Sequence, residues 1–527
     1  MGFGIDFGST NSVFLFMDPH SGNNPGKNGI YHTGGNGNDP TPSVAWVNRM
    51  VADDHPQRHV WGQNPSNPNA YFRMPNLKWH LGFRPKFNHD GQAFDAQPLV
   101  TGYLKHLFNR LIAGEAFRKA YNTKNEVVAS VPVTFGPGYR GRLRTCLENA
   151  GFGNVRLVYE PTAAAIACLD NSGALAKSSD MRGPILVMDW GGGTVDISLI
   201  EFKENGEIID IHNTGIANGL GGIAMDLDLA FRGSTEEAFA AIQGMNNDKR
   251  TKLLAAIEAY KLRAIHCLDN GIPCPDSDQT IVDGAGNAHT ILLTEANVKE
   301  CVTRFCGKIH ATALAMVGQA GLSPEDVKHK IMVGGPFRSN HVKLHKAFND
   351  WNAELLECDL SSQIATALGC AILADRGYQI RLATDVVVYQ SGGDYYRIAR
   401  HREGFPTDSN PSRICQGVRF TMQDLTATEA IFQIGRMAGP RQSDNDYACL
   451  KYVPFPTPLS VPVCHSMMEG APPFCPSLDA HLDRDLTLTI EATGRLGNLH
   501  AAAELNPTDR MHLDCLPLLI QMEPTPA

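Results

Sequence analysis

The chain has 527 residues, of which 43% are hydrophobic and 19% are charged, and its net charge is −9 with a pI near 6.1. This length is too great for one hydrophobic core and predicts roughly two to four domains. The acidic balance and the lack of a dense basic run argue against a nucleic-acid-binding surface. The sequence has no long apolar run, and Asp6 interrupts the first apolar residues, so we expect no membrane contact, no signal peptide and a cytoplasmic location.

The 13 cysteines are scattered without a CxxC pair. Many of them lie inside apolar runs, such as Cys146, Cys168, Cys267 and Cys370. We therefore expect buried, reduced thiols rather than disulfides or a zinc site.

The first predicted elements are two strands joined by a tight turn. Residues 3–15 read FGIDFGSTNSVFL, in which Asp6, Gly8 and the hydroxyls of Ser9 and Thr10 separate two apolar stretches. A glycine turn between strands is usually just a hairpin, so this motif alone is a weak signal. The Gly- and Asn-rich residues 20–40 that follow predict an exposed inserted loop, with a functional lid as the less favoured alternative.

The next elements are helical and then alternate with strands. The apolar positions of residues 99–112 follow helical spacing. Residues 127–135 predict a buried strand, residues 138–150 a helix and residues 155–159 a parallel strand, which together make a β-α-β unit. Glu160 begins the helix after this unit, where it could reach a metal ion or its waters; a carboxylate that interacts only with the helix dipole is the alternative.

A second glycine turn follows the pattern of the first. Residues 185–202 read ILVMDWGGGTVDISLIEF, an apolar strand, a turn of three glycines and Thr194, and a second strand. Three glycines bury no side chain, so we expect their N–H groups to approach a bulky anion such as a phosphate. Asp189 and Asp196 flank the turn and would repel a bare phosphate unless a divalent cation lies between them. Two such turns together predict a nucleotide bound with Mg²⁺ between two related lobes.

Residues 226–297 are mostly helical in period, and Glu258 and Lys261 lie one turn apart, a spacing also common in surface ion pairs. Residues 330–339, KIMVGGPFRS, predict a strand, two glycines with room for a flat base, and then a helix through Phe348; Arg338 could stack on the base. Residues 361–376 predict a helix of small residues. From Tyr378 onward the sequence pattern predicts strands separated by Pro/Gly loops. Apolar and polar residues alternate at 478–491, as in a half-exposed pair of antiparallel strands.

These motifs resemble those of the heat-shock protein 70 (DnaK-like) chaperone family, whose ATPase domain has the actin-like superfold. The resemblance is carried by FGIDFGSTNS, VMDWGGGTVDISLIE, TPSVAW, VASVPVTF, YEPTAAAIAC, GLGG and IMVGGPFRS, in the order of the family. It implies an α/β fold: a two-lobed actin-like (ribonuclease H-like) ATPase domain at 1–380, with lobes at about 1–184 and 185–380. An apolar linker at 381–388, a small antiparallel β-sandwich at 389–505 and a tail at 506–527 would follow. Few residues remain after Leu505, so we expect a variant without the helical lid.

The resemblance also implies roles for individual residues. The expected catalytic residues are Lys78, Glu160, Asp189, Thr194 and Asp196. The expected metal contacts, through water, are Asp6 and Asp189, and the relay positions are Pro132 and Arg140. The expected ATP/ADP-binding residues are Asp6, Gly8, Ser9, Thr10, Asn11, Gly191, Gly192, Gly193, Thr194, Gly221, Gly222, Glu258, Lys261, Gly334, Gly335 and Arg338. Two positions depart from the family pattern. The basic and hydroxyl residues that the family places just after the Glu258–Lys261 pair are replaced here by Leu262 and Ile265. The Pro-Asp pair that begins the family's hinge helix is replaced by Ser362-Gln363.

The implied activity is ATP hydrolysis coupled to the binding of an unfolded or specific protein client by residues 389–505, with a possible co-chaperone or exchange factor. A nucleotide-dependent switch for one dedicated partner is the main alternative, and the short C-terminal segment favours it. A small-molecule kinase of the same superfold is a less favoured alternative, because the sequence shows no dedicated acid for an acceptor site. A filament-forming ATPase is a further alternative, and the β-rich C-terminal segment argues against it.

Overall fold

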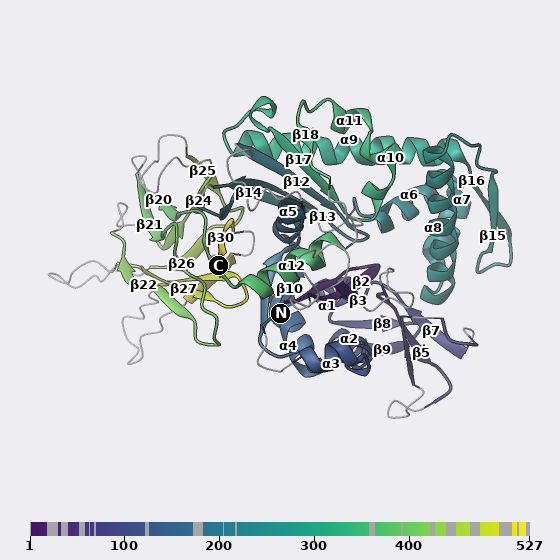
Figure 1. Ribbon diagram of the computed structural model, residues 1–527, viewed down its shortest axis with the longest axis horizontal. Helices are drawn as coiled ribbons and strands as arrows, with labels where there is room; N and C mark the ends of the chain where they lie inside the picture. The colour runs from purple at the N-terminus through teal and green to yellow at the C-terminus, as the bar shows by residue number, and fades with distance from the viewer. Residues whose placement is uncertain are drawn as a thin grey trace. The chain divides into compact units, whose positions relative to one another are not determined.

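The computed structural model describes residues 2–17, 30–32, 41–51, 58–62, 64–67, 70–121, 126–171, 183–203, 205–216, 219–357, 364–390, 394–421, 427–438, 450–463, 475–494, 508–513 and 516–522. The fold is mixed α/β, as the sequence predicts (Figure 1). It divides into two compact units. The first consists of residues 1–198, 214–315 and 324–377, and the second of residues 199–213, 316–323 and 378–527.

The N-terminal sheet of the first unit has the strand order β11-β10-β1-β2-β3, with β4 paired to β2. Its strands are β1 (Phe3–Phe7), β2 (Asn11–Met17), β3 (Ile30–His32), β4 (Thr41–Pro42), β10 (Val127–Val131) and β11 (Val155–Tyr159). β1 and β2 are antiparallel, with Asp6 opposite Val13, whereas β10 is parallel to both β1 and β11. The predicted hairpin at residues 3–15 and the predicted β-α-β unit are therefore confirmed.

Helices and two small sheets surround this N-terminal sheet. The helices are α1 (Leu77–Phe83), α2 (Ala96–Ala113), α3 (Glu115–Ala120), α4 (Pro137–Ala150) and α5 (Glu160–Asn171). The small sheets are β5 (Ala45–Asn48) between β6 (His59–Trp61) and β7 (Tyr71–Met74), and β8 (Lys86–His89) with β9 (Gln92–Asp95). α2 begins where Asp95 accepts a hydrogen bond from the backbone N–H of Gln97, and its predicted apolar face is buried.

The other sheet strands of the first unit follow the order β18-β17-β12-β13. They are β12 (Pro184–Trp190), β13 (Val195–Phe202), β17 (His329–Val333) and β18 (Glu354–Leu355). The boundary between the two units falls inside β13 and inside β14 (Glu207–Ile216), so both strands contribute to both units. The second predicted strand pair, at residues 185–202, is confirmed.

Helices α6 (Gly222–Arg232), α7 (Glu236–Gly244), α8 (Asn247–Asp269) and α9 (Glu295–Gln319) follow. Residues 226–297 are predicted to be mostly helical, and this prediction missed a hairpin formed by β15 (Ser277–Val282) and β16 (Ala288–Leu293). Its turn forms because the Asp283 carboxylate accepts from the backbone N–H groups of Ala285 and Asn287.

Two other helices differ from expectation. The helix predicted through Phe348 is divided into three short helices: η3 (Pro336–Arg338), α10 (Asn340–Lys343) and α11 (Lys346–Asn349). A separate short helix, η2 (Pro324–Asp326), precedes β17. The division occurs because the side chains of Ser339 and His345 each cap a new helix start. The small-residue helix is α12 (Ala365–Arg376), which packs against α5, β1, β2 and β10 (Figure 1); residues 361–363 lie outside the described residues.

The second unit is built mainly from strands around one apolar core. They are β19 (Tyr378–Leu382), β20 (Val386–Tyr389), β21 (Tyr395–Ala399), β22 (Ser412–Arg419), β23 (Glu429–Phe432), β24 (Ile434–Ala438), β25 (Lys451–Pro454), β26 (Leu459–Pro462), β27 (Ser477–Asp483), β28 (Thr487–Thr493), β29 (Thr508–Leu513) and β30 (Leu518–Met522). Two four-stranded sheets, β21-β20-β24-β25 and β22-β27-β28-β29, supply most of the core. The antiparallel pair predicted at residues 478–491 is confirmed by β27 and β28. β27 alternates between buried and partly buried residues as predicted, whereas the first four residues of β28 are all buried.

Segments predicted as linker and tail are part of this unit. Residues 386–388 lie in β20 and are buried in the core. β30 lies between β14 and β19 and is antiparallel to both, so residues 518–522 form an interior strand. The limits of the four predicted segments remain predictions.

The described cysteines are free thiols, and all but Cys475 are buried. In the part of the chain that the structure describes, no helix is both long enough and apolar enough to cross a membrane.

Candidate nucleotide site

The two glycine turns of the first unit face each other. A β-carbon added to Gly192 would lie 2.0 Å from Thr10 Oγ1, and one added to Gly193 would lie 2.5 Å from Ser9 Oγ. A side chain at either position would require the facing hydroxyl to move, because real β-carbons do not approach other atoms this closely. The hydroxyls of one turn therefore lie directly against the backbone of the other.

A cavity of about 660 Å³ opens beside these turns, entirely within the first unit. Most of the predicted site residues line it: Asp6, Gly8, Ser9, Thr10, Asn11, Lys78, Glu160, Asp189, Gly191, Gly192, Thr194, Gly222, Glu258, Lys261, Gly334, Gly335 and Arg338. Three predicted residues are not among the lining residues. Asp196 is buried and accepts a hydrogen bond from the backbone N–H of Val133, while Gly193 and Gly221 pack against neighbouring backbone or hydroxyl atoms.

Four carboxylates lie in or next to this cavity: Asp6, which is half-buried, and Glu160, Asp189 and Asp196, which are buried. Each has a specific donor. Ser130 Oγ donates to Asp6 Oδ1 at 3.0 Å, and Thr366 Oγ1 donates to Asp189 Oδ2 at 3.2 Å. The buried Lys78 forms an ion pair with Glu160. The carboxylates are thus fixed in direction by residues distant in sequence.

Burial is the main influence on the pKa values of these acids, and repulsion by neighbouring acids adds to it for Glu160, Asp189 and Asp196. It raises the pKa of Glu160 to about 8 and the pKa values of Asp189 and Asp196 to about 7; the pKa of Asp6 is raised as well. Burial opposes the charge on Lys78, but Glu160, Tyr139 and Asp6 outweigh that effect and raise its pKa. One lysine thus faces four acids, and the electrostatics favour an additional cation.

The donor set fits Mg²⁺, which prefers carboxylate oxygen and retains several of its waters. Among the described residues, no group of three or more Asp, Glu, His or Cys side chains is close enough to enclose a metal ion by itself. Asp6 and Asp189 both line the cavity and carry the carboxylate oxygens that Mg²⁺ prefers.

Lys261 and Glu258 line the cavity from α8, but the amine of Lys261 is already engaged. Its Nζ lies 2.7 Å from Asp226 Oδ1 and donates to the carbonyl oxygen of Gly222 at 3.0 Å. Lys261 thus holds the N-terminal turn of α6, whose Gly221 cap offers no side chain to the helix. Sequence reasoning missed Asp226, although its position in the first turns after the GLGG motif was a usable signal.

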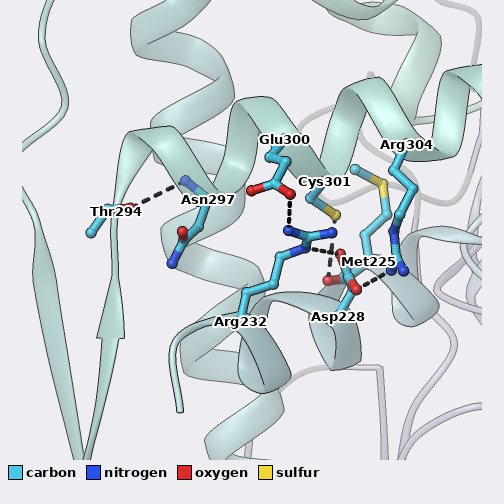
Figure 2. A network of polar contacts seen from close by, with 8 residues as sticks. All are labelled: Met225, Asp228, Arg232, Thr294, Asn297, Glu300, Cys301 and Arg304. Atoms are coloured by element: carbon cyan, nitrogen blue, oxygen red, sulfur yellow. Dashed lines mark hydrogen bonds and ion pairs between the residues drawn. The ribbon is translucent and has the colours of Figure 1, made fainter. Parts of the chain in front are cut away.

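A second network anchors the other end of α6 to α9, as Figure 2 shows. Asp228 is buried and forms ion pairs with Arg232 and Arg304, and Arg232 also pairs with Glu300. The thiol of Cys301 donates weakly to the carbonyl oxygen of Met225 at 3.9 Å. The helix that begins at the cavity is therefore held by polar contacts at both ends.

One end of the cavity is lined by α8 and by the turn after β17. Gly334 has φ = +99°, and a β-carbon there would lie 2.2 Å from the carbonyl oxygen of Trp190, so only glycine fits. Asp269 at the end of α8 accepts from Ser339 Oγ at 2.8 Å and from the N–H of His341 at 2.7 Å. This acid fixes the turn that carries Arg338, and the sequence pattern did not identify it. Leu262 and Ile265 also line this end, which makes it more apolar than the family pattern implies.

Comparison with known proteins identifies the family that this chain resembles in sequence. The family model described as "Hsp70 protein" matches residues 86–415. Chaperone protein DnaK of Methanothermobacter thermautotrophicus is 29% identical over 324 residues, which is 60% of this chain and 50% of that protein. Chaperone protein DnaK of Thermoplasma volcanium is 30% identical over 254 residues, which is 47% of this chain and 39% of that protein. The chain thus spans half or less of the length of these relatives.

Proposed function

This chain belongs to the Hsp70 protein family, and from that premise we propose that it is a chaperone-like ATPase. In this proposal two actin-like lobes hold ATP and Mg²⁺ between them. The nucleotide state then controls the binding of a protein client by the β-rich residues 389–505. DnaK relatives are named as chaperone proteins, which supports the chaperone class for this chain.

One observation carries the proposal: two glycine turns from different sheets meet at a cavity that is lined by the carboxylates of Asp6, Glu160 and Asp189 and by the buried Lys78. The turns supply backbone N–H groups and hydroxyls, which are the donors that phosphate oxygens accept. The carboxylates supply negative charge that is unfavourable unless a cation is present. A Mg²⁺-bound nucleoside triphosphate satisfies both sets of groups.

The residues divide the work as follows. The hydroxyls of Ser9, Thr10 and Thr194 and the N–H group of Gly192 bind phosphate oxygens, while the N–H of Gly191 closes the turn by donating to the carbonyl oxygen of Thr194 at 2.9 Å. Mg²⁺, held by Asp6 and Asp189 through water, would neutralise phosphate charge. Lys78 stabilises the negative charge that develops as the terminal phosphoryl group is transferred to water. Asp196 or Asp189 accepts a hydrogen bond from the attacking water and orients it, and Glu160 keeps Lys78 in place.

The test is ATP hydrolysis by the full-length protein, measured with and without saturating unfolded protein. We expect Mg²⁺-dependent phosphate release that changes when the client is added. We expect Asp189→Asn to reduce the rate by at least about tenfold. If turnover is insensitive to unfolded clients but responds to one specific protein, the dedicated-switch alternative replaces the chaperone role. Transfer of the phosphoryl group to a metabolite instead of water would establish a kinase and end the proposal.

A further inference from the structure

Thr366 is the second residue of α12 and lines the cavity. Its side chain is almost fully buried, and its Oγ1 donates a hydrogen bond to Asp189 Oδ2 at 3.2 Å. Threonine hydroxyls in helices often bond to the carbonyl of the preceding turn instead. In α12 the hydroxyl is directed to an acid that is 177 positions away in the sequence.

The helix that carries Thr366 is held rigidly against the N-terminal sheet. A β-carbon on Gly4 of β1 would lie 2.0 Å from the carbonyl oxygen of Ala367, and one on Gly369 would lie 1.7 Å from the carbonyl oxygen of Ala163 in α5. Backbones that approach so closely leave little freedom for α12 to shift. The position of Thr366 is therefore set by the sheet that contains β1.

Asp189 belongs to the other sheet of the first unit, at the end of β12. The hydrogen bond from Thr366 thus joins an element packed on one sheet to a carboxylate carried by the other. The second oxygen of the same carboxylate, Oδ1, lies against Gly334, because a β-carbon there would be 3.0 Å from it. The carboxylate of Asp189 is confined from two sides, by a hydroxyl and by a glycine backbone.

We propose that Thr366 is a positioning residue, whose hydroxyl holds the carboxylate of Asp189 in the orientation required to bind Mg²⁺ and nucleotide together. The inference rests on the proposed function and adds a residue that the sequence pattern did not identify. Mg²⁺ demands near-ideal octahedral geometry, so the direction of each oxygen around it matters. Groups that orient such ligands typically contribute about 10- to 100-fold to metal affinity.

The experiment measures the ADP affinity of the full-length protein with Mg²⁺ and with a chelator, and the readout is the gain in affinity that Mg²⁺ provides. Thr366→Val keeps the shape of the side chain and removes the hydroxyl, and Thr366→Ala removes it by a second route if the valine variant does not fold. Thr366→Ser retains the hydroxyl. Thr384→Val is the matched control, because Thr384 is a buried threonine that donates to the carbonyl oxygen of Met437 and does not line the cavity.

We expect Thr366→Val to reduce the Mg²⁺-dependent gain about tenfold while ADP affinity in chelator is unchanged. Thr366→Ser and Thr384→Val should keep the gain of the parent protein. An equal loss with and without Mg²⁺ would mean that Thr366 only supports the local structure, and no loss at all would mean that it does not act; either result overturns the inference. A parent protein that binds no ADP would instead refute the proposed function itself.

Discussion

Gly192 and Thr10 are in such close contact that a single added methyl group at position 192 would fall 2.0 Å from the threonine hydroxyl oxygen. The two residues belong to turns that leave different sheets, β12-β13 and β1-β2. Their approach brings the hydroxyls of the first turn and the glycines of the second to one side of the cavity. The contact between Gly192 and Thr10 is therefore the point at which the two halves of the site meet.

Gly192→Ala should force these turns apart and weaken nucleotide binding. The added β-carbon overlaps Thr10 Oγ1 and would lie 3.1 Å from Thr10 Cβ, so the hydroxyl must rotate away and the turns must shift slightly apart. We expect ADP affinity to fall by about tenfold or more, measured by calorimetry. Gly307→Ala is the control, because nothing lies within 4 Å of that β-carbon and the position is inside α9. Unchanged affinity in Gly192→Ala would contradict the facing of the two turns.

Lys78→Met should abolish most ATP hydrolysis without unfolding the protein. Lys78 is buried beside Glu160, and methionine fills similar space while removing the only charge that balances this acid at close range among the described residues. Burial already raises the pKa of Glu160 to about 8, so the acid can become neutral when the lysine is absent. We expect kcat to fall by about 100-fold or more. Lys330→Met tests another buried lysine, which donates only to backbone carbonyls in the described structure and should affect stability but not kcat.

Asp196 should make the ligand-free protein less stable as the pH rises. Burial, followed by repulsion from Glu160, raises its pKa from 3.8 to about 7 in the folded state. Between these values the native state binds more protons than the unfolded state, so the free energy of unfolding falls with increasing pH. The half-buried His80 and the buried His212 act with the opposite sign, because burial lowers their pKa values to about 4 and about 3.

The comparison that isolates Asp196 is between the parent protein and Asp196→Asn, since the histidines are common to both. The asparagine variant should lose less stability between about pH 5 and about pH 8, as followed by thermal unfolding. Identical pH dependence in the two proteins would show that Asp196 is ionised throughout this range.

A chain that ends at Leu513 should be less stable than one that ends at Met522. The shorter chain lacks β30, which pairs with β14 on one side and β19 on the other. It also loses four described side chains that are fully buried: Leu516, Leu518, Leu519 and Ile520. We expect a lower unfolding midpoint and concentration-dependent aggregation through the two exposed strand edges. Equal midpoints for the two chains would show that β30 contributes little.

Local patterns accounted for most of the elements that form the candidate site. The glycine turns, the β-α-β unit and α2 could be predicted because each depends on the period and turn residues of a short segment. The hairpin β15-β16 was missed because two six-residue strands with one exposed face lie among long helices, whose period dominates the surrounding sequence. The end of the predicted helix at Lys343 was missed because it depends on side-chain capping by His345.

The sequence by itself determined the family, the order of the elements and which residue types would surround a bound nucleotide, because these follow from motifs read along the chain. Only the tertiary structure decided which donor holds each acid, such as Ser130 for Asp6 and Thr366 for Asp189. It also decided that residues 518–522 form a strand between β14 and β19. Contacts between distant segments depend on how helices and sheets pack, and no local period records that packing.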